Sequence, residues 1–154
     1  MPTQSEKAAL FRALHEKTGS FLIPNPWDAG SARILAGLGY DALATSSGAS
    51  AGVLGKRDGK VTRDEALAHA RAIVEATDLP VAADLEKGFG DSPQAAAETI
   101  RLAAAAGLVG LATSLYRAAM SGLIDAAREA RDRGTFGYLD KTLSTPDLNG
   151  FMRP

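Results

Sequence analysis

Two carboxylates separated by one residue, Asp84 and Glu86, follow the apolar run of residues 79–83 in this 154-residue chain. In an extended segment, residues two apart point to the same side, so we expect the two carboxylates to lie together. Like charges this close repel unless a cation lies between them or one is protonated. Carboxylate oxygens favour Mg²⁺ and also suit Mn²⁺, so the pair predicts a metal site. The pair alone leaves an alternative open, in which Asp84 caps a loop while Glu86 and Lys87 form a solvated edge.

Hydroxyl and glycine residues follow the preceding apolar run, residues 40–45, as Ser46, Ser47 and Gly48. Such groups suit a carboxylate or phosphoryl oxygen, which needs several neutral donors. An ordinary flexible loop is the alternative. Asp58 lies further along in the charged turn 56–59, which on its own is typical of a solvated loop tip.

These residues need elements that bring them together, and the chain predicts strands alternating with helices. The predicted helices are 5–17, a segment after Asp28, a segment opened by Thr62 and Glu65, a segment opened by Ser92 and Pro93, and 111–132 with a strand-like entry. The predicted strands are 21–23, 40–45 and 79–84, with a fourth starting at 107–110. Three strand–helix repeats indicate right-handed βαβ units of an α/β fold, in a barrel or an open doubly wound sheet. In both, ligands bind beyond the carboxyl ends of the strands.

Composition narrows the class of protein. The length suits one domain, and the net charge of -1 gives no basic stripe for nucleic acid. The absence of cysteine excludes disulfides, thiolate zinc sites and a cysteine nucleophile. There is neither an apolar run of about 18 residues to span a membrane nor a signal-peptide core at the N-terminus. We therefore expect a cytoplasmic domain with no membrane or nucleic-acid partner.

Three segments, 24–49, 54–59 and 79–110, resemble the isocitrate lyase and phosphoenolpyruvate mutase family in order and spacing. The resemblance covers residues 20–110. It implies a Mg²⁺-dependent (β/α)₈ TIM barrel, often assembled as a dimer of dimers. It also implies making or breaking C–C or P–C bonds of small α-keto or α-hydroxy acids through an enolate of pyruvate.

The resemblance also implies roles for individual residues. Asp84 matches the most direct metal ligand, and Glu86 stands where many members have a second Asp that acts through water. Asp58 matches an acid on a mobile loop that helps to order water in the site, so Asp58 and Glu86 are the expected catalytic acids. The expected substrate-binding residues, which would hold a small carboxylate or keto acid, are Trp27, Ser46, Ser47 and Gly48.

After Gly110 the chain departs from the family pattern, because residues 111–140 resemble the eighth strand and final helix of the barrel. A full barrel needs about 250 residues, so we expect about 100 residues to be missing between Gly110 and Leu111, including an acidic ligand and a catalytic loop. The predicted fold is thus one truncated barrel-type domain, with 1–110 as its N-terminal half and 111–154 as the closing helix and tail. Activity could then be impaired, and an inactive barrel fragment or oligomerising interaction protein is the alternative. Unpaired strand edges and uncovered apolar surface predict a homo-oligomer.

Overall fold

A small parallel sheet organises the chain in the computed structural model, which describes residues 1–112 and 132–134. The strand order is β1-β2-β3, and both pairs are parallel. Register places Leu43 opposite Val81 and Asp84 opposite Ala112. The elements in chain order are α1 (Gln4–Glu16), α2 (Ala29–Gly37), β1 (Leu43–Ala44), α3 (Ser47–Val53), α4 (Arg63–Glu75), β2 (Val81–Asp84), α5 (Pro93–Ala105) and β3 (Gly110–Ala112).

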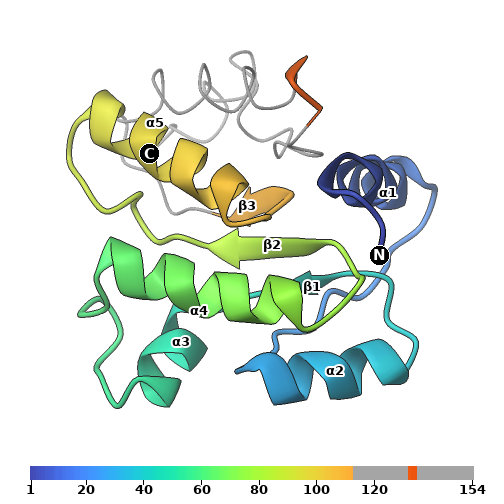
Figure 1. Cartoon of the computed structure of the whole chain (residues 1–154), viewed down its shortest axis with the longest axis horizontal. Coiled ribbons are helices and arrows are strands. Elements are labelled where there is room, and N and C mark those ends of the chain that lie inside the picture. Colours follow the sequence, from blue (N-terminus) through green and yellow to red (C-terminus); the bar gives the residue numbers. More distant parts are fainter. Residues whose placement is uncertain (113–131, 135–154) are drawn as a thin grey trace, which may run out of the picture.

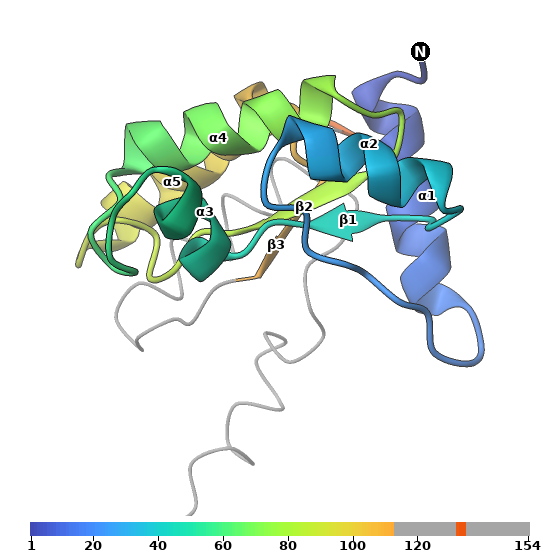
Figure 2. The same ribbon diagram turned by 90° about the horizontal axis from the view of Figure 1, so that it is seen from below.

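The sheet is covered on both faces, as expected for parallel strands rich in apolar residues. One face packs against α2, α4 and α5, and this core includes Ala32, Leu43, Ile73, Val81, Ala83, Ala103 and Leu108. Figure 2 shows α2 and α4 together on one side of the strands. The other face packs against α1 through Ala8, Phe11, Leu14, Ala42, Ala82 and Val109. Alternation of Val81, Ala82 and Ala83 between the two cores follows from the period of two in a strand.

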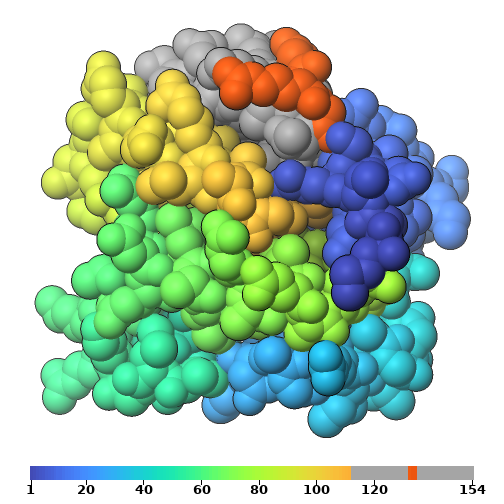
Figure 3. All heavy atoms as spheres, viewed as in Figure 1, coloured from blue at the N-terminus to red at the C-terminus, as the bar shows by residue number. Residues whose placement is uncertain are grey.

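Helix α1 is also tied to the far end of α5. The Gln4 side-chain amide donates to the carbonyl oxygens of Ala104 at 2.8 Å and Leu108 at 3.0 Å. These carbonyls lie in and just after the last turn of α5, where helical partners run out. In Figure 3 the N-terminal residues, in dark blue, lie against the end of α5 and the start of β3, in gold.

The helix starts predicted from caps are confirmed. Thr62 and Glu65 form a capping box at α4, and Ser92 caps α5 with Pro93 in its first turn. Asp28 caps α2, where its side chain accepts from the Ser31 N–H. The carboxyl ends of β1 and β2 lie at the same edge as the amino ends of α4 and α5 (Figure 1).

The predicted strand at 21–23 is wrong. These residues lie outside the sheet, and the Leu22 side chain is 75% exposed. The segment meets β1 through the Ala44 N–H, which donates to the Pro24 carbonyl at 3.1 Å. Pro24 and Pro26 have no N–H to donate to a ladder, so regular pairing with β1 cannot continue along this segment.

Two other boundaries differ from the prediction. The segment between the predicted strand 40–45 and the predicted helix opened by Thr62 contains the short helix α3, in which the side chains of Ala49, Ser50 and Ala51 are buried. Strand β3 begins at Gly110 and runs through Leu111, so the Gly110–Leu111 junction lies inside a paired strand. This agrees with the strand-like entry predicted at 111, but the helix predicted to follow lies mostly outside the described residues.

Within residues 1–112 and 132–134, no helix is both long enough and apolar enough to cross a bilayer.

Candidate functional site

Asp84 is held firmly at the carboxyl end of β2. Its backbone N–H donates to the Thr45 hydroxyl at 3.2 Å, which links it to the residue after β1. Its side-chain oxygens each accept one backbone N–H, Oδ2 from Ser47 at 3.3 Å and Oδ1 from Glu86 at 3.0 Å. A carboxylate oxygen has two lone pairs, so both oxygens keep acceptor capacity. The half-buried Asp84 carboxylate is therefore fixed in place and still able to bind a cation.

Glu86 does not continue the strand, so the geometric reason given for pairing it with Asp84 is wrong. β2 ends at Asp84, and Glu86 has a left-handed backbone with φ of 50°. Non-glycine residues rarely adopt this conformation, and Phe89, with φ of 59°, repeats it in the same loop. Burial raises the pKa of the Glu86 carboxyl, and the charges of Asp58 and Asp84 raise it further, while Lys87 opposes them. The charge of Asp84 thus acts on Glu86 through space.

Asp58 reaches the same region from the loop before α4. Its Oδ1 accepts the Gly59 N–H at 3.1 Å. Its Oδ2 would lie 3.8 Å from a Cβ built on Gly48, and the Ser46 hydroxyl would lie 3.9 Å from that Cβ. Both are ordinary contact distances, so Gly48 is not required by lack of space. The structure therefore brings together Asp58, Gly48 and Ser46.

Ser46 and Ser47 have different surroundings. The Ser46 hydroxyl caps α3 by accepting the Ala49 N–H at 3.4 Å. Ser47 is joined to Asp84 through its backbone N–H. Trp27 is 60% exposed on the loop before α2, and its carbonyl lies 2.7 Å from His69 Nε2. His69 therefore anchors the Trp27 loop.

The carboxylate oxygens at and around Asp84 fit a divalent cation that keeps much of its water. Among the residues the structure describes, no group of three or more His, Asp or Glu side chains is placed to hold a metal. Mg²⁺ is bound in many sites by one or two carboxylates, with water and substrate completing its shell. Asp84 matches that pattern. Two further carboxylates belong to the same region, because the charges of Asp58 and Asp84 both act on Glu86.

Sequence reasoning missed Thr45 and Arg63. Thr45 is 6% exposed and positions Asp84; a hydroxyl residue at the end of an apolar strand could have indicated it. Arg63 opens α4 and lines a cavity of about 510 Å³ that also borders Glu86. Of the predicted site residues only Glu86 lines this cavity, and the others lie outside its walls, namely Trp27, Ser46, Ser47, Gly48, Asp58 and Asp84.

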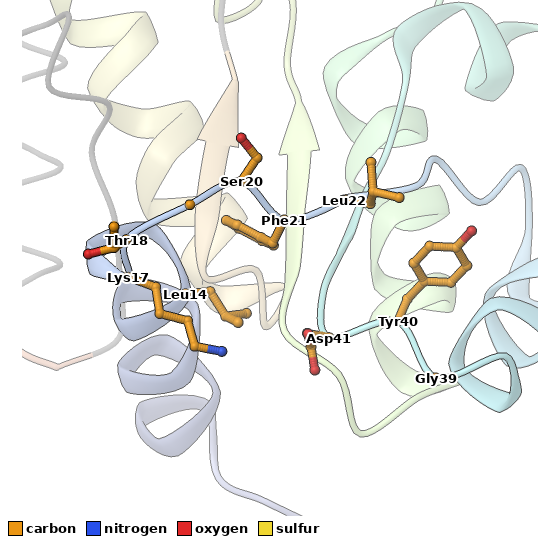
Figure 4. Close-up of a pocket in the computed structure, with 10 residues that line it drawn as sticks. Leu14, Lys17, Thr18, Ser20, Phe21, Leu22, Gly39, Tyr40 and Asp41 are labelled. Carbon is orange, nitrogen blue, oxygen red and sulfur yellow. The ribbon is translucent and has the colours of Figure 1, made fainter.

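A second cavity, of about 430 Å³, lies at the opposite end of the sheet (Figure 4). Its walls come from the end of α1 and the turn before β1, including Leu14, Phe21, Tyr40 and Asp41. Asp41 precedes β1, so the cavity borders the amino ends of the strands, where α/β proteins do not place their catalytic groups.

Comparisons with known proteins identify the family of this chain. The model of the family "Phosphoenolpyruvate phosphomutase" matches residues 11–113. The 2,3-dimethylmalate lyase of Eubacterium barkeri is 41% identical over 87 residues, which cover 55% of this chain and 30% of that lyase.

Two crystal structures from Burkholderia cenocepacia J2315 share the fold. One, described as a lyase/mutase, has a TM-score of 0.75 and 48% identity, and the match covers 81% of this chain and 50% of that chain. The other, described as a phosphonomutase, has a TM-score of 0.78 and 38% identity, and the match covers 88% of this chain and 58% of that chain. The chain thus spans between about a third and three-fifths of these relatives. The α/β fold and the resemblance predicted for residues 20–110 are confirmed, and the chain belongs to the phosphoenolpyruvate phosphomutase family, in the phosphoenolpyruvate mutase/isocitrate lyase superfamily.

Proposed function

We propose that this protein binds Mg²⁺, or Mn²⁺ in its place, through Asp84 and Glu86, and acts on a small α-keto or α-hydroxy carboxylic acid. The observation that carries the proposal is the fixed Asp84 carboxylate, whose two oxygens each accept a backbone N–H and keep acceptor capacity. Its place at the carboxyl end of β2 is where α/β enzymes bind ligands. The related lyase, named for its action on 2,3-dimethylmalate, supports a hydroxy-acid substrate.

The reaction class follows from the family, which includes lyases and phosphonomutases. When bound, the metal would polarise a keto or hydroxy oxygen of the substrate as a Lewis acid. Breaking a C–C or P–C bond next to that group leaves an enolate-type anion on one fragment, and its negative charge needs stabilisation. We propose that the Asp84 carboxylate is the direct ligand, and that Thr45 and Ser47 orient it.

The other site residues would act on substrate and water. Ser46, Ser47 and Gly48 would hold the substrate carboxylate, since they lie between Asp84 and Asp58. Asp58, with one oxygen turned toward Gly48, would order a water molecule. Glu86 would be the second acid near the metal, acting through water. Trp27 would contribute an exposed aromatic surface at the edge of the site.

A ligand-binding experiment tests this proposal. The thermal midpoint of the protein is measured with Mg²⁺, with oxalate as a mimic of the enolate, and with both together. A ligand that binds only the folded state stabilises it by about 2.7 kcal/mol at a hundred times its dissociation constant. For a chain of this size that is a rise of roughly 5–10 °C.

We expect the rise for wild type, its loss in Asp84→Ala, and its retention in the control Asp78→Ala, whose carboxylate lies exposed before β2. No rise for wild type, or an equal rise for Asp84→Ala, contradicts the proposal.

The second candidate is a catalytically inactive fragment that associates through its apolar surface. Two exposed side chains one turn apart favour it, Ile34 on α2 at 66% and Leu38 at the C-cap of α2 at 69%. Large apolar side chains on the outside of a helix are common at interfaces between proteins. A homo-oligomer without any response to Mg²⁺ and oxalate would support this candidate over the first.

A further inference from the structure

The cavity of about 510 Å³ beside Glu86 extends the candidate site toward the start of α4. Its size is within the range of small-molecule sites. Its walls come from the end of the Asp58 loop, the first turn of α4 and the loop after β2, and comprise Gly59, Val61, Thr62, Arg63, Asp64, Glu86, Lys87 and Phe89. Glu86 lines the cavity, and its N–H donates to Asp84 Oδ1 at 3.0 Å. A ligand that meets Asp84 and Glu86 with one end can therefore place its other end against α4.

Arg63 lies in this wall, and its positive charge is only weakly paired. Its Nε is buried and has no hydrogen-bond partner among the residues the structure describes. Its contact with Asp64 Oδ1 is 3.9 Å long, which is too long for a hydrogen bond. The Asp64 side chain is itself 89% exposed, so water screens this pair. The Arg63 side chain keeps 33% exposure, and it is this exposed part that a ligand could meet.

Two neighbouring cations are already engaged by carboxylates. Lys56 pairs with Glu65, which belongs to the capping box of α4. Lys87 pairs with Asp91 at 2.7 Å. Arg63 differs from both, because no described carboxylate lies within hydrogen-bonding distance of its Nε. Its planar guanidinium also suits two parallel hydrogen bonds to a carboxylate, which an ammonium group cannot make.

We propose that Arg63 binds a second, distal carboxylate of the substrate and so selects dicarboxylic keto or hydroxy acids over monocarboxylic ones. The inference rests on the proposed function, which places the α-keto acid head of the substrate at Asp84 and Glu86. Val61, which is buried, and Phe89 would pack against the carbon chain between the two ends. Arg63 is thus a specificity-determining residue.

Matched ligands test the proposal. 2-Oxoglutarate and 2-oxopentanoate carry the same α-keto acid head, but only the first has a distal carboxylate. Their dissociation constants are measured with Mg²⁺ for wild type, Arg63→Gln, Arg63→Lys and the control Lys60→Gln. The control removes a positive charge from the preceding loop, at an exposed position outside the cavity. Oxalate, which has no distal group, reports on the metal site alone.

We expect wild type and Lys60→Gln to bind 2-oxoglutarate roughly ten- to a hundredfold more tightly than 2-oxopentanoate, since charge-assisted hydrogen bonds are strong. Arg63→Gln should lose this preference but keep its affinity for oxalate and 2-oxopentanoate, and Arg63→Lys should keep part of the preference. Retained oxalate binding also shows that Arg63→Gln is folded. Equal affinity of wild type for both keto acids, or a preference that survives in Arg63→Gln, would overturn the role of Arg63 while oxalate binding upholds the metal site. Failure of wild type to bind oxalate with Mg²⁺ would overturn both.

Discussion

Replacing Thr45 by Val tests whether Asp84 is positioned from the neighbouring strand. The Thr45 hydroxyl accepts the Asp84 N–H at 3.2 Å, and the Thr45 side chain is buried at 6% exposure. Valine has nearly the same shape but no acceptor. The substitution therefore leaves the Asp84 N–H without this partner at the end of β2, while the packing around residue 45 changes little.

The expected cost comes from the orphaned donor. A buried donor without a partner costs about 1–3 kcal/mol, and because Asp84 is only half-buried we expect the lower part, about 1–2 kcal/mol. For a chain of about 150 residues this lowers the thermal midpoint by roughly 2–8 °C. The ligand-induced rise with Mg²⁺ and oxalate should also shrink, because Asp84 is held less firmly.

Urea and thermal unfolding, each with and without ligand, measure both effects. Thr45→Ser is the matched control, since it keeps the hydroxyl and loses one buried methyl group, at about 0.8 kcal/mol. It should lose stability but keep the ligand-induced rise. Wild-type stability in Thr45→Val, or an equal loss of the rise in both variants, would refute the positioning role.

Three further predictions concern packing, pH and association. A Cβ on Gly110 would lie 2.6 Å from Phe11 Cε1, so Gly110→Ala should lower the free energy of unfolding in urea by about 1–3 kcal/mol. Adding Phe11→Leu should recover part of this loss. A double variant whose loss equals the sum of the two single losses would contradict the prediction. The pKa of Glu65 is lowered to about 2, chiefly by its hydrogen bond to Lys56. The contribution of Glu65 to stability is therefore present above a pH of about 4.5 and is lost as pH falls toward 2. Glu65→Gln should flatten the fall of the urea midpoint in that window, and a pH profile equal to that of wild type would contradict this prediction. Sedimentation at low concentration should show an oligomer that Ile34→Gln with Leu38→Gln weakens, and a compact, stable wild-type monomer would contradict it.

Local patterns predicted much of the fold because their causes are local. The capping box of Thr62 and Glu65 fixes the start of α4, and Ser92 with Pro93 fixes the start of α5. The apolar run before Asp84 predicted β2, which is buried on both faces. Each of these depends on a few neighbouring residues.

The incorrect predictions fall where contacts between residues far apart in the sequence determine the local structure. Helix α3 contains glycine and serine, which are poor helix formers, and its buried side chains at 49–51 make it helical through packing. The apolar residues of 21–23 suggested a strand, but Pro24 and Pro26 remove the donors that a ladder needs.

The candidate site was predicted in its residues more than in its geometry. Asp84 lies at the strand end as expected, but Glu86 reaches its neighbourhood through a left-handed turn rather than an extended strand. The role of Arg63 could not be predicted because its cavity is completed by the loop after β2, more than twenty residues away in the chain. Pairing between strands and loops of this kind cannot be read from spacing along one segment.

The most direct test of the central claim, a divalent metal held by Asp84, is a titration with Mn²⁺ followed by electron paramagnetic resonance. Free Mn²⁺ is measured as protein is added, for wild type, Asp84→Asn and the control Asp78→Asn. Asparagine keeps the size of the side chain and removes its charge. We predict one saturable Mn²⁺ site that Mg²⁺ displaces, present in wild type and Asp78→Asn, and weakened at least tenfold in Asp84→Asn, as for loss of a charged ligand. Mn²⁺ binding of equal strength in Asp84→Asn, or none in wild type, would contradict the claim.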